Sequence, residues 1–187
     1  MIMSKSKEWF LETELFNRHV KFPYAEHWLG YSILFMRLAM GWVLLQGGLT
    51  KVFDPSWSAE GFLLHAVADT NPFAEVFASL AGSPVVDFLV VWGLILTGVG
   101  VFFGVLLRFS AFWAAIMMFM FYLAALLGGF SSGLALEHGF VINEHIIYIA
   151  ILWGLSTFGA GQIFGVDGWL RKQGVVKKHP WLNHFLG

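Results

Sequence analysis

The sequence predicts an all-α integral membrane protein, a four-transmembrane-helix bundle with short interfacial helices in its first outer loop. Three observations predict this class. Apolar residues make up 58% of the 187 residues and charged residues only 12%, against roughly a quarter charged in soluble domains. Four apolar runs each come close to the ~20 residues that cross a bilayer. Lys and Arg gather on alternate connections between these runs.

The four runs define a membrane domain over residues 28–170. The predicted helices cover about 28–49, 85–106, 109–127 and 141–158. The second and third runs together exceed one span and are separated by little more than Arg108 and Ser110, so we expect a tight helical hairpin there. The glycines and Asp167 that follow the fourth run indicate a helix end and a turn.

Positive charges predict the orientation of the chain. Nine basic residues fall on one side of a four-helix topology: Lys5, Lys7, Arg18, Lys21, Arg108, Arg171, Lys172, Lys177 and Lys178. In the opposite connections, 51–84 and 128–140, Lys51 is the only Lys or Arg, and the other charged residues are Asp and Glu. Because cytoplasmic loops carry an excess of Lys and Arg, we expect a multi-pass protein of the cell membrane with both termini in the cytoplasm.

The segments outside the spans have patterns of their own. Residues 1–27 are predicted to form a cytoplasmic amphipathic tail, in which residues 8–16 have spacings compatible with a short interfacial helix. Residues 171–187 form a basic cytoplasmic tail. The outer loop 51–84 is predicted to contain one or two short helices, the first capped by Ser56 or Ser58 and the second begun at Asn71. Their apolar faces would lie on the outer membrane surface or cover the mouth of the bundle.

Composition limits the possible functions. A net charge of −1 gives no indication of nucleic-acid binding, and the chain contains no cysteine. Disulfides, iron–sulfur clusters and thiolate metal sites are therefore excluded for this subunit. Membrane lipid is the expected surrounding, and any electron transfer would need an imported cofactor.

Arg37 is the only basic residue well inside an apolar run. Burying such a charge costs about 3 kcal/mol on insertion scales, so the side chain should face the bundle or snorkel. Two interpretations are open. The guanidinium pairs with a backbone carbonyl or with Asp167, or it contacts an anion or a lipid headgroup.

A candidate site is expected near the outer surface. Gln46 and Lys51 end the first run, and Glu144, His145 and Tyr148 lie in the outer turns of the fourth, so the five groups share a depth. A quinone needs hydrogen-bond partners for its carbonyl oxygens and a group that exchanges protons, which histidine and glutamate supply. The alternative is an ordinary polar cap where helix ends meet water.

Other polar or soft side chains favour structural roles. His65, His138 and His145 could be proposed as metal or haem ligands, but none belongs to a strict spacing motif, and no metal site is predicted. Met117, Met118 and Met120 are typical of packing and lipid contacts. The glycines of the first two runs predict close helix packing, since small residues let helix backbones approach each other in lipid. They are Gly41, Gly48, Gly93, Gly98, Gly100 and Gly104.

Three segments carry a family resemblance. They are RLAMGWVLLQGGLTKVFDPSW, GLILTGVGVFFGVLLRFSAFWAAIMMF and EHIIYIAILWGLSTFGAGQIFGVDGWL. Over about residues 32–171 the chain resembles the DoxX/DoxD family of small membrane proteins, which implies a four-helix membrane bundle. The DPSW, EHG and EH segments look more like DoxD, the membrane subunit of archaeal thiosulfate:quinone oxidoreductase, which implies thiosulfate oxidation to tetrathionate, quinone as cofactor and a second, DoxA-like subunit on the outer face.

These observations lead to two functional hypotheses. In the first, the chain is a membrane subunit of a quinone-linked oxidoreductase, in which His145 and Glu144 handle protons. Gln46, Lys51, Tyr148 and Arg37 would then bind or support the quinone. In the second, it is a non-catalytic anchor or assembly subunit of a redox complex, and a homo-oligomer is an alternative assembly. A solute transporter is disfavoured because the sequence has no inverted repeat.

Overall fold

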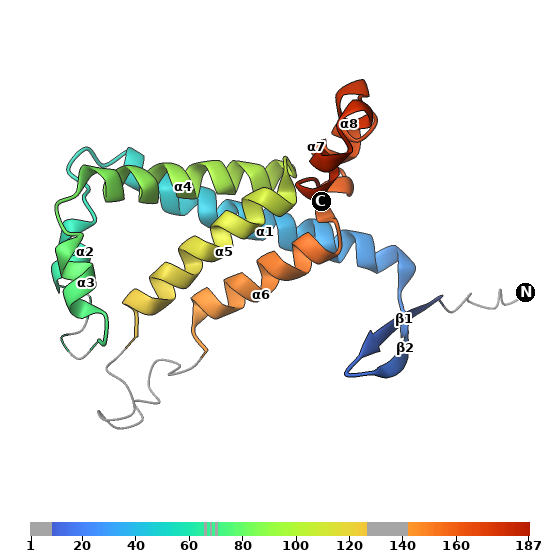
Figure 1. The fold of residues 1–187 in the computed structure, drawn as a ribbon, viewed down its shortest axis with the longest axis horizontal. Helices are drawn as coiled ribbons and strands as arrows, with labels where there is room; N and C mark the ends of the chain where they lie inside the picture. The colour runs from blue at the N-terminus through green and yellow to red at the C-terminus, as the bar shows by residue number, and fades with distance from the viewer. Residues whose placement is uncertain (1–8, 66, 68, 70, 127–141) are drawn as a thin grey trace, which may run out of the picture.

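The computed structural model describes residues 9–126, apart from 66, 68 and 70, and residues 142–187. Three of its helices are long and apolar enough to cross a membrane: α1 (Glu26–Val52), α4 (Pro84–Phe103) and α5 (Leu107–Ala124). A fourth helix, α6 (Glu144–Thr157), runs beside α5 (Figure 1). Its 14 residues reach only about 21 Å, so the fourth span remains a prediction.

The four helices pack in the order α1, α4, α5, α6, with a smaller contact between α6 and α1. The core they share contains Met40 and Leu44 of α1, Val101 of α4, Ala114 of α5 and Leu152 of α6. Large apolar side chains also cover the outside of these helices. Because soluble proteins rarely expose contiguous apolar surface on this scale, the structure and the hydropathy both indicate a multi-pass membrane protein.

The turn between α4 and α5 lies earlier in the chain than the sequence predicted. Gly104 ends α4 with a φ of +65°, and Leu106 precedes α5 with a φ of +46°. The turn therefore lies at residues 104–106, and Arg108 and Ser110 already belong to α5. Glycine suits the first of these positions because it adopts a left-handed backbone without a steric penalty.

The outer loop contains two short helices, α2 (Glu60–His65) and α3 (Ala74–Ser79). The Ser58 hydroxyl accepts a hydrogen bond from the N–H of Glu60, as expected of a cap, whereas Ser56 bonds to Asp54. Leu63 and Phe77 pack with Ala124 in a second apolar cluster. The loop helices thus cover the end of the bundle that the charge pattern predicts to face outward, which we call the outer end. That it faces outward and that the loop helices touch the membrane surface remain predictions.

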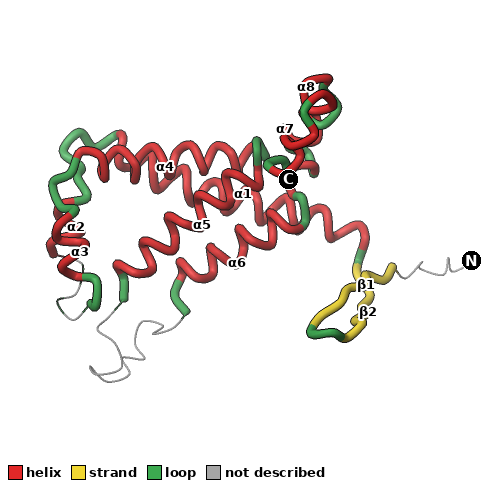
Figure 2. Tube along the Cα trace, in the orientation of Figure 1, coloured by secondary structure: helices red, strands yellow, loops and turns green. Residues whose placement is uncertain are grey.

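The N-terminal segment is not the interfacial helix that residues 8–16 suggested. It forms an antiparallel hairpin of β1 (Trp9–Leu15) and β2 (Arg18–Tyr24) (Figure 2). Phe16 and Asn17 both have positive φ, at 49° and 59°, which is the geometry of a two-residue type I′ turn. The helical prediction was wrong because the spacing of the apolar residues also fits the two-residue period of a strand.

The chain beyond α6 folds into short elements. They are η3 (Ala160–Gln162), α7 (Val166–Leu170), α8 (Gly174–Lys178) and η4 (Pro180–His184). These elements lie at one end of the long helices, together with the α4–α5 turn and the β1–β2 hairpin, and α2 and α3 lie at the other end (Figure 1). The described basic segments therefore share one end, as the charge pattern predicted; that this end is cytoplasmic remains a prediction.

Candidate functional site

A buried arginine marks the basic end of the bundle. Arg37 is 2% exposed. Its Nη1 donates to the carbonyl oxygens of Ala160 and Ile163, both at 2.7 Å, and its Nη2 donates to that of Phe164 at 3.4 Å. These carbonyls follow α6, in and directly after the short helix η3, where the carbonyl of Ala160 also accepts a hydrogen bond from the N–H of Ile163. The sequence left two interpretations of Arg37 open, and these bonds match the structural one.

Asp167, which is fully buried, accepts hydrogen bonds from three backbone N–H groups. Its Oδ1 accepts from the N–H of Leu106 at 2.7 Å, and its Oδ2 accepts from those of Leu107 and Gly187, both at 2.8 Å. The first N–H groups of a helix have no intrahelical partner and attract negative charge. Asp167 therefore caps the start of α5 from a distant part of the chain, and its charge attracts the nearby guanidinium of Arg37.

Glycine is required around this pair of charges. A Cβ at Gly104 would lie 3.0 Å from Nη1 of Arg37, and a Cβ at Gly161 would lie 2.5 Å from Oδ2 of Asp167. A Cβ at Gly165 would clash with the carbonyl oxygen of Gly161. We call Arg37, Asp167 and these three glycines the basic-end cluster. Its hydrogen bonds join α1, the α4–α5 turn and the segment after α6, which makes it a structural connection.

At the outer end, the structure brings together Glu144, His145 and Tyr148 at the start of α6. Asn143 caps this helix, since its Oδ1 accepts from the N–H groups of His145 and Ile146. The His145 side chain is 19% exposed and that of Glu144 is 66% exposed, with 3.9 Å between Nδ1 and Oε1. The carboxylate therefore reaches the surface while the imidazole lies mostly inside.

The imidazole of His145 faces aromatic rings. Its centroid lies 6.0 Å from that of Phe121 on α5 and 6.4 Å from that of Tyr148 on its own helix. Its Nδ1 is buried and has no hydrogen-bond partner among the described residues. Buried polar atoms in proteins are usually paired, so this nitrogen is available for a partner outside that part of the chain.

Lys51 and Gln46 do not complete this group. The Nζ of Lys51 donates to the carbonyl oxygen of Gly47 at 3.0 Å and lies 5.2 Å from the ring centroid of Trp57. Its charge thus satisfies the C-terminal turn of α1 and the adjoining outer loop. Gln46 is exposed. Lys51 therefore has partners on α1 and in the outer loop, and a single site formed by the α1 and α6 groups remains a prediction.

The remaining histidine and methionine predictions have simple outcomes. His65 is exposed at the end of α2, and His138 lies outside the described residues. The described part of the chain contains no group of three or more side chains that could hold a metal ion. Met118 is buried in the core, and Met120 is exposed on α5.

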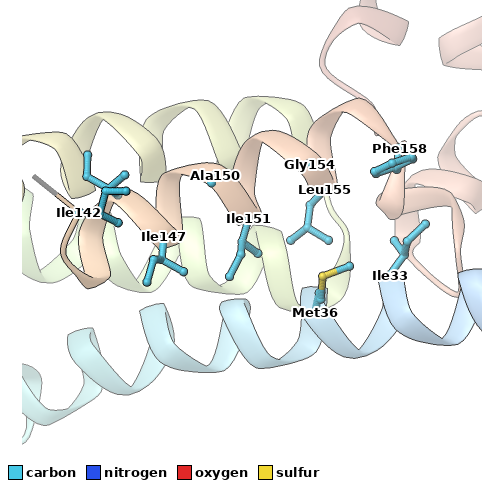
Figure 3. A pocket seen from close by; sticks show the side chains of 10 residues that line it. Ile33, Met36, Ile142, Ile147, Ala150, Ile151, Gly154, Leu155 and Phe158 are labelled. Carbon is cyan, nitrogen blue, oxygen red and sulfur yellow. The ribbon is translucent and has the colours of Figure 1, made fainter. Parts of the chain in front are cut away.

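An apolar groove of about 480 Å³ runs between α6 and α1. Figure 3 shows side chains of Ile147, Ile151 and Leu155 on α6 facing the α1 side chains of Met36 and Ile33. Ala150 and Gly154 widen the groove because they present little or no side chain, and a Cβ at Gly154 would meet nothing within 4 Å. The groove can therefore accept a hydrocarbon chain.

Asn71 has a structural role that the sequence analysis missed. It is 4% exposed, and its Nδ2 donates to the carbonyl oxygens of Leu123, Ala124 and Leu126 at 2.9 to 3.1 Å. Its Oδ1 accepts from the N–H of Phe73. The sequence marked Asn71 only as the start of a helix, because carbonyl partners leave no signal in a sequence. Asn71 in fact joins the outer loop to the end of α5.

Comparison with known proteins gives one match. A sequence model of the DoxX family matches residues 32–127, which covers α1 from residue 32 onward and all of α4 and α5. No curated protein and no solved structure matches the chain.

Proposed function

This chain belongs to the DoxX family, and we propose that it is the membrane subunit of a quinone-linked oxidoreductase. The observation that carries the proposal is the position of His145. A mostly buried imidazole lies beside Phe121 and Tyr148 and adjoins an exposed carboxylate, and its Nδ1 makes no hydrogen bond among the described residues. Quinone reduction adds two electrons and two protons, so a path from the aqueous surface to a buried hydrogen-bonding group is what the reaction needs.

In this proposal Glu144 collects protons at the outer surface and His145 passes them to a quinone oxygen. Tyr148 and Phe121 provide the flat aromatic surroundings. The groove between α6 and α1 would hold the isoprenoid tail, because it is lined by Ile142, three residues before His145, and by Ile146, directly after it. Lys51 and Gln46 stay at the outer surface of α1, where they would bind an anion or a partner.

Thiosulfate is the proposed donor on the strength of the DoxD resemblance. Two thiosulfate ions would each lose one electron as a sulfur–sulfur bond forms between them, and the two electrons would reduce one quinone. The chain has no thiol to react with thiosulfate. The electrons would therefore arrive through a second subunit docked at the outer end, with α6 as the fourth span and both termini in the cytoplasm.

Quinone reduction by the purified chain with its co-expressed partner tests the assignment. His145→Gln keeps a hydrogen-bonding side chain but cannot titrate, so we expect turnover to fall at least about 100-fold, the low end of general acid–base effects. Glu144→Gln should lower turnover less, because water can supply the outermost proton. His65→Gln on the same face is the matched control. Unchanged turnover in folded His145→Gln would refute the role of His145.

The groove is tested separately by filling it. Gly154→Leu adds a side chain where a Cβ meets nothing within 4 Å, so the fold should tolerate it. Gly30→Leu is the control, since Gly30 is also helical and also faces open space. We expect Gly154→Leu alone to reduce the quinone extracted with the protein. Equal quinone content in both variants would show that the groove does not hold the tail.

A second candidate function is a non-catalytic anchor for a redox complex. The basic-end cluster favours this function, because Arg37 and Asp167 form hydrogen bonds with the chain's own backbone and so stabilise the fold instead of binding a ligand. An anchor would co-purify with a larger complex, contain no quinone and support full activity of that complex with His145→Gln. Loss of activity in that variant, with the complex still assembled, would exclude the anchor.

A further inference from the structure

The N-terminal hairpin has two chemically different faces. Residues paired across the strands point to the same side. One face carries the pairs Trp9–Tyr24, Leu11–Phe22 and Thr13–Val20 and, next to the turn, Leu15–Arg18. The other face carries Phe10–Pro23, Glu12–Lys21 and Glu14–His19. We call the first the apolar face and the second the charged face of the hairpin.

The charged face is already satisfied. Lys21 donates to Glu12 at 2.7 Å and lies 5.0 Å from the ring centroid of Phe10, and His19 lies 3.2 Å from Glu14. On the apolar face, the large side chains of Val20 and Phe22 are 36% and 42% exposed. A lone two-stranded hairpin is marginally stable in water and needs something to pack against its apolar side.

The position of the hairpin identifies what covers it. Tyr24 ends β2, and only Ala25 separates it from α1. The first turns of α1 carry Trp28 and Tyr31, which are 72% and 66% exposed, as expected of an aromatic belt at the level of lipid headgroups. One residue of connection spans less than 4 Å, so the base of the hairpin lies at the same level.

We propose that the hairpin lies on the membrane surface, with its apolar face in the boundary between headgroups and acyl chains and its charged face in water. Trp, Tyr and Phe are the residues that favour this boundary, and the charged face combines both signs of charge with high exposure. In Figure 1 the hairpin leaves the end of α1 at an angle to the helix axis. The partner is thus phospholipid.

The absence of cysteine from the sequence allows a direct test. The full chain, in vesicles of phosphatidylcholine and phosphatidylglycerol, would carry one nitroxide label at a time. Thr13→Cys and Val20→Cys report the apolar face, and His19→Cys reports the charged face. Tyr31→Cys serves as the lipid-exposed reference and Lys178→Cys as the water-exposed one. The measurement is the ratio of collision rates with oxygen, which dissolves in lipid, and with a water-soluble nickel chelate.

We expect the ratio at Thr13→Cys and Val20→Cys to exceed that at His19→Cys at least threefold and to approach the lipid reference. Equal ratios on both faces would overturn the proposal. Low collision rates with both reagents on the apolar face would also overturn it, since a protein partner would then cover that face. A double variant with labels at both Thr13 and Val20, which pair directly across the strands, checks that the hairpin forms. The two labels should show strong dipolar broadening. Absence of broadening would show that the apolar face does not exist as described and would overturn the proposal.

Discussion

Replacing Gly41 by alanine tests how closely α1 and α4 must pack. A Cβ at Gly41 would lie 2.5 Å from both the Cα and the N of Phe102, whereas ordinary van der Waals contact begins at 3.4 Å. The obstacle is backbone, so no side-chain rotation can relieve it. The two helices would have to separate by about 0.9 Å, which would also loosen the neighbouring contact of Gly98 with Leu45.

The magnitude follows from two opposing effects. Overpacking of this kind costs about 1–3 kcal/mol, and replacing a helical glycine by alanine returns about 1 kcal/mol of helix propensity. We therefore expect Gly41→Ala to lower the free energy of unfolding by up to about 2 kcal/mol. Gly154→Ala is the matched control, since its Cβ meets nothing within 4 Å. That variant should gain up to about 1 kcal/mol.

The assay is unfolding by sodium dodecyl sulfate in mixed micelles, followed by circular dichroism. It compares the midpoints of Gly41→Ala, Gly154→Ala and the unmodified chain under one set of conditions. Opposite signs for the two variants would support close packing between α1 and α4. If Gly41→Ala were as stable as Gly154→Ala, the backbone contact at Phe102 would not exist in the membrane protein, and the reasoning from packing would fail.

Two further predictions concern charged side chains. Asp167→Asn keeps one acceptor oxygen and turns the other into a donor that faces backbone N–H groups, so it should lower the free energy of unfolding by about 3 kcal/mol in the same assay. Asp69→Asn on the exposed outer loop is the control and should leave the stability unchanged. If Asp167→Asn were as stable as the unmodified chain, the capping role of Asp167 would be refuted. The hydrogen bond and the charge of Lys21 lower the pKa of Glu12 below its ordinary value, so the pair stabilises the hairpin above the unfolded pKa of Glu12 and stops doing so as pH falls through the lower, folded value. A nitroxide at Thr13 should then gain mobility as the pH is lowered from about 6 to about 3, whereas Glu12→Gln should show no such step.

The spans could be predicted from sequence because a bilayer is a uniform apolar solvent. A run of about 20 apolar residues then specifies a helix without any knowledge of its neighbours. The same simplicity explains why α4 and α5 were expected as a hairpin. Hydropathy does not determine where the turn lies in the sequence. Gly104 and Leu106 adopt positive φ. A turn at these residues, and not at Arg108, depends on the cap that Asp167 provides from 60 residues beyond Leu107.

The hairpin of β1 and β2 was missed for a local reason. Leu11 and Leu15 are four apart, which suits a helix, but Trp9, Leu11 and Thr13 also alternate as a strand does. The turn that would have decided between them has Phe16 and Asn17 at its centre. Without glycine at the second position, the usual sequence signal of a two-residue turn is absent.

The candidate site shows what depth alone determines. Counting along the first and fourth runs placed Lys51 and His145 at one depth, and depth is one coordinate of three. The rotation of each helix about its axis and the order of helices in the bundle supply the others. Since α6 packs chiefly on α5, His145 faces Phe121, and Lys51 turns instead to Trp57.

The two ends of the bundle differ in how their buried polar groups are satisfied. At the basic end, Arg37 and Asp167 bond to six backbone groups of the same chain, so a ligand there would have to displace existing bonds. At the outer end, Nδ1 of His145 has no partner in the described part of the chain. An unsatisfied buried nitrogen costs about 1–3 kcal/mol, and binding a quinone oxygen would recover that cost. At the basic end, Nε of Arg37 is also buried without a hydrogen-bond partner among the described residues, but both other guanidinium nitrogens of Arg37 and both oxygens of Asp167 are bonded to backbone. The number of bonds that a ligand would have to displace therefore favours chemistry at the outer end and a structural role for the basic end.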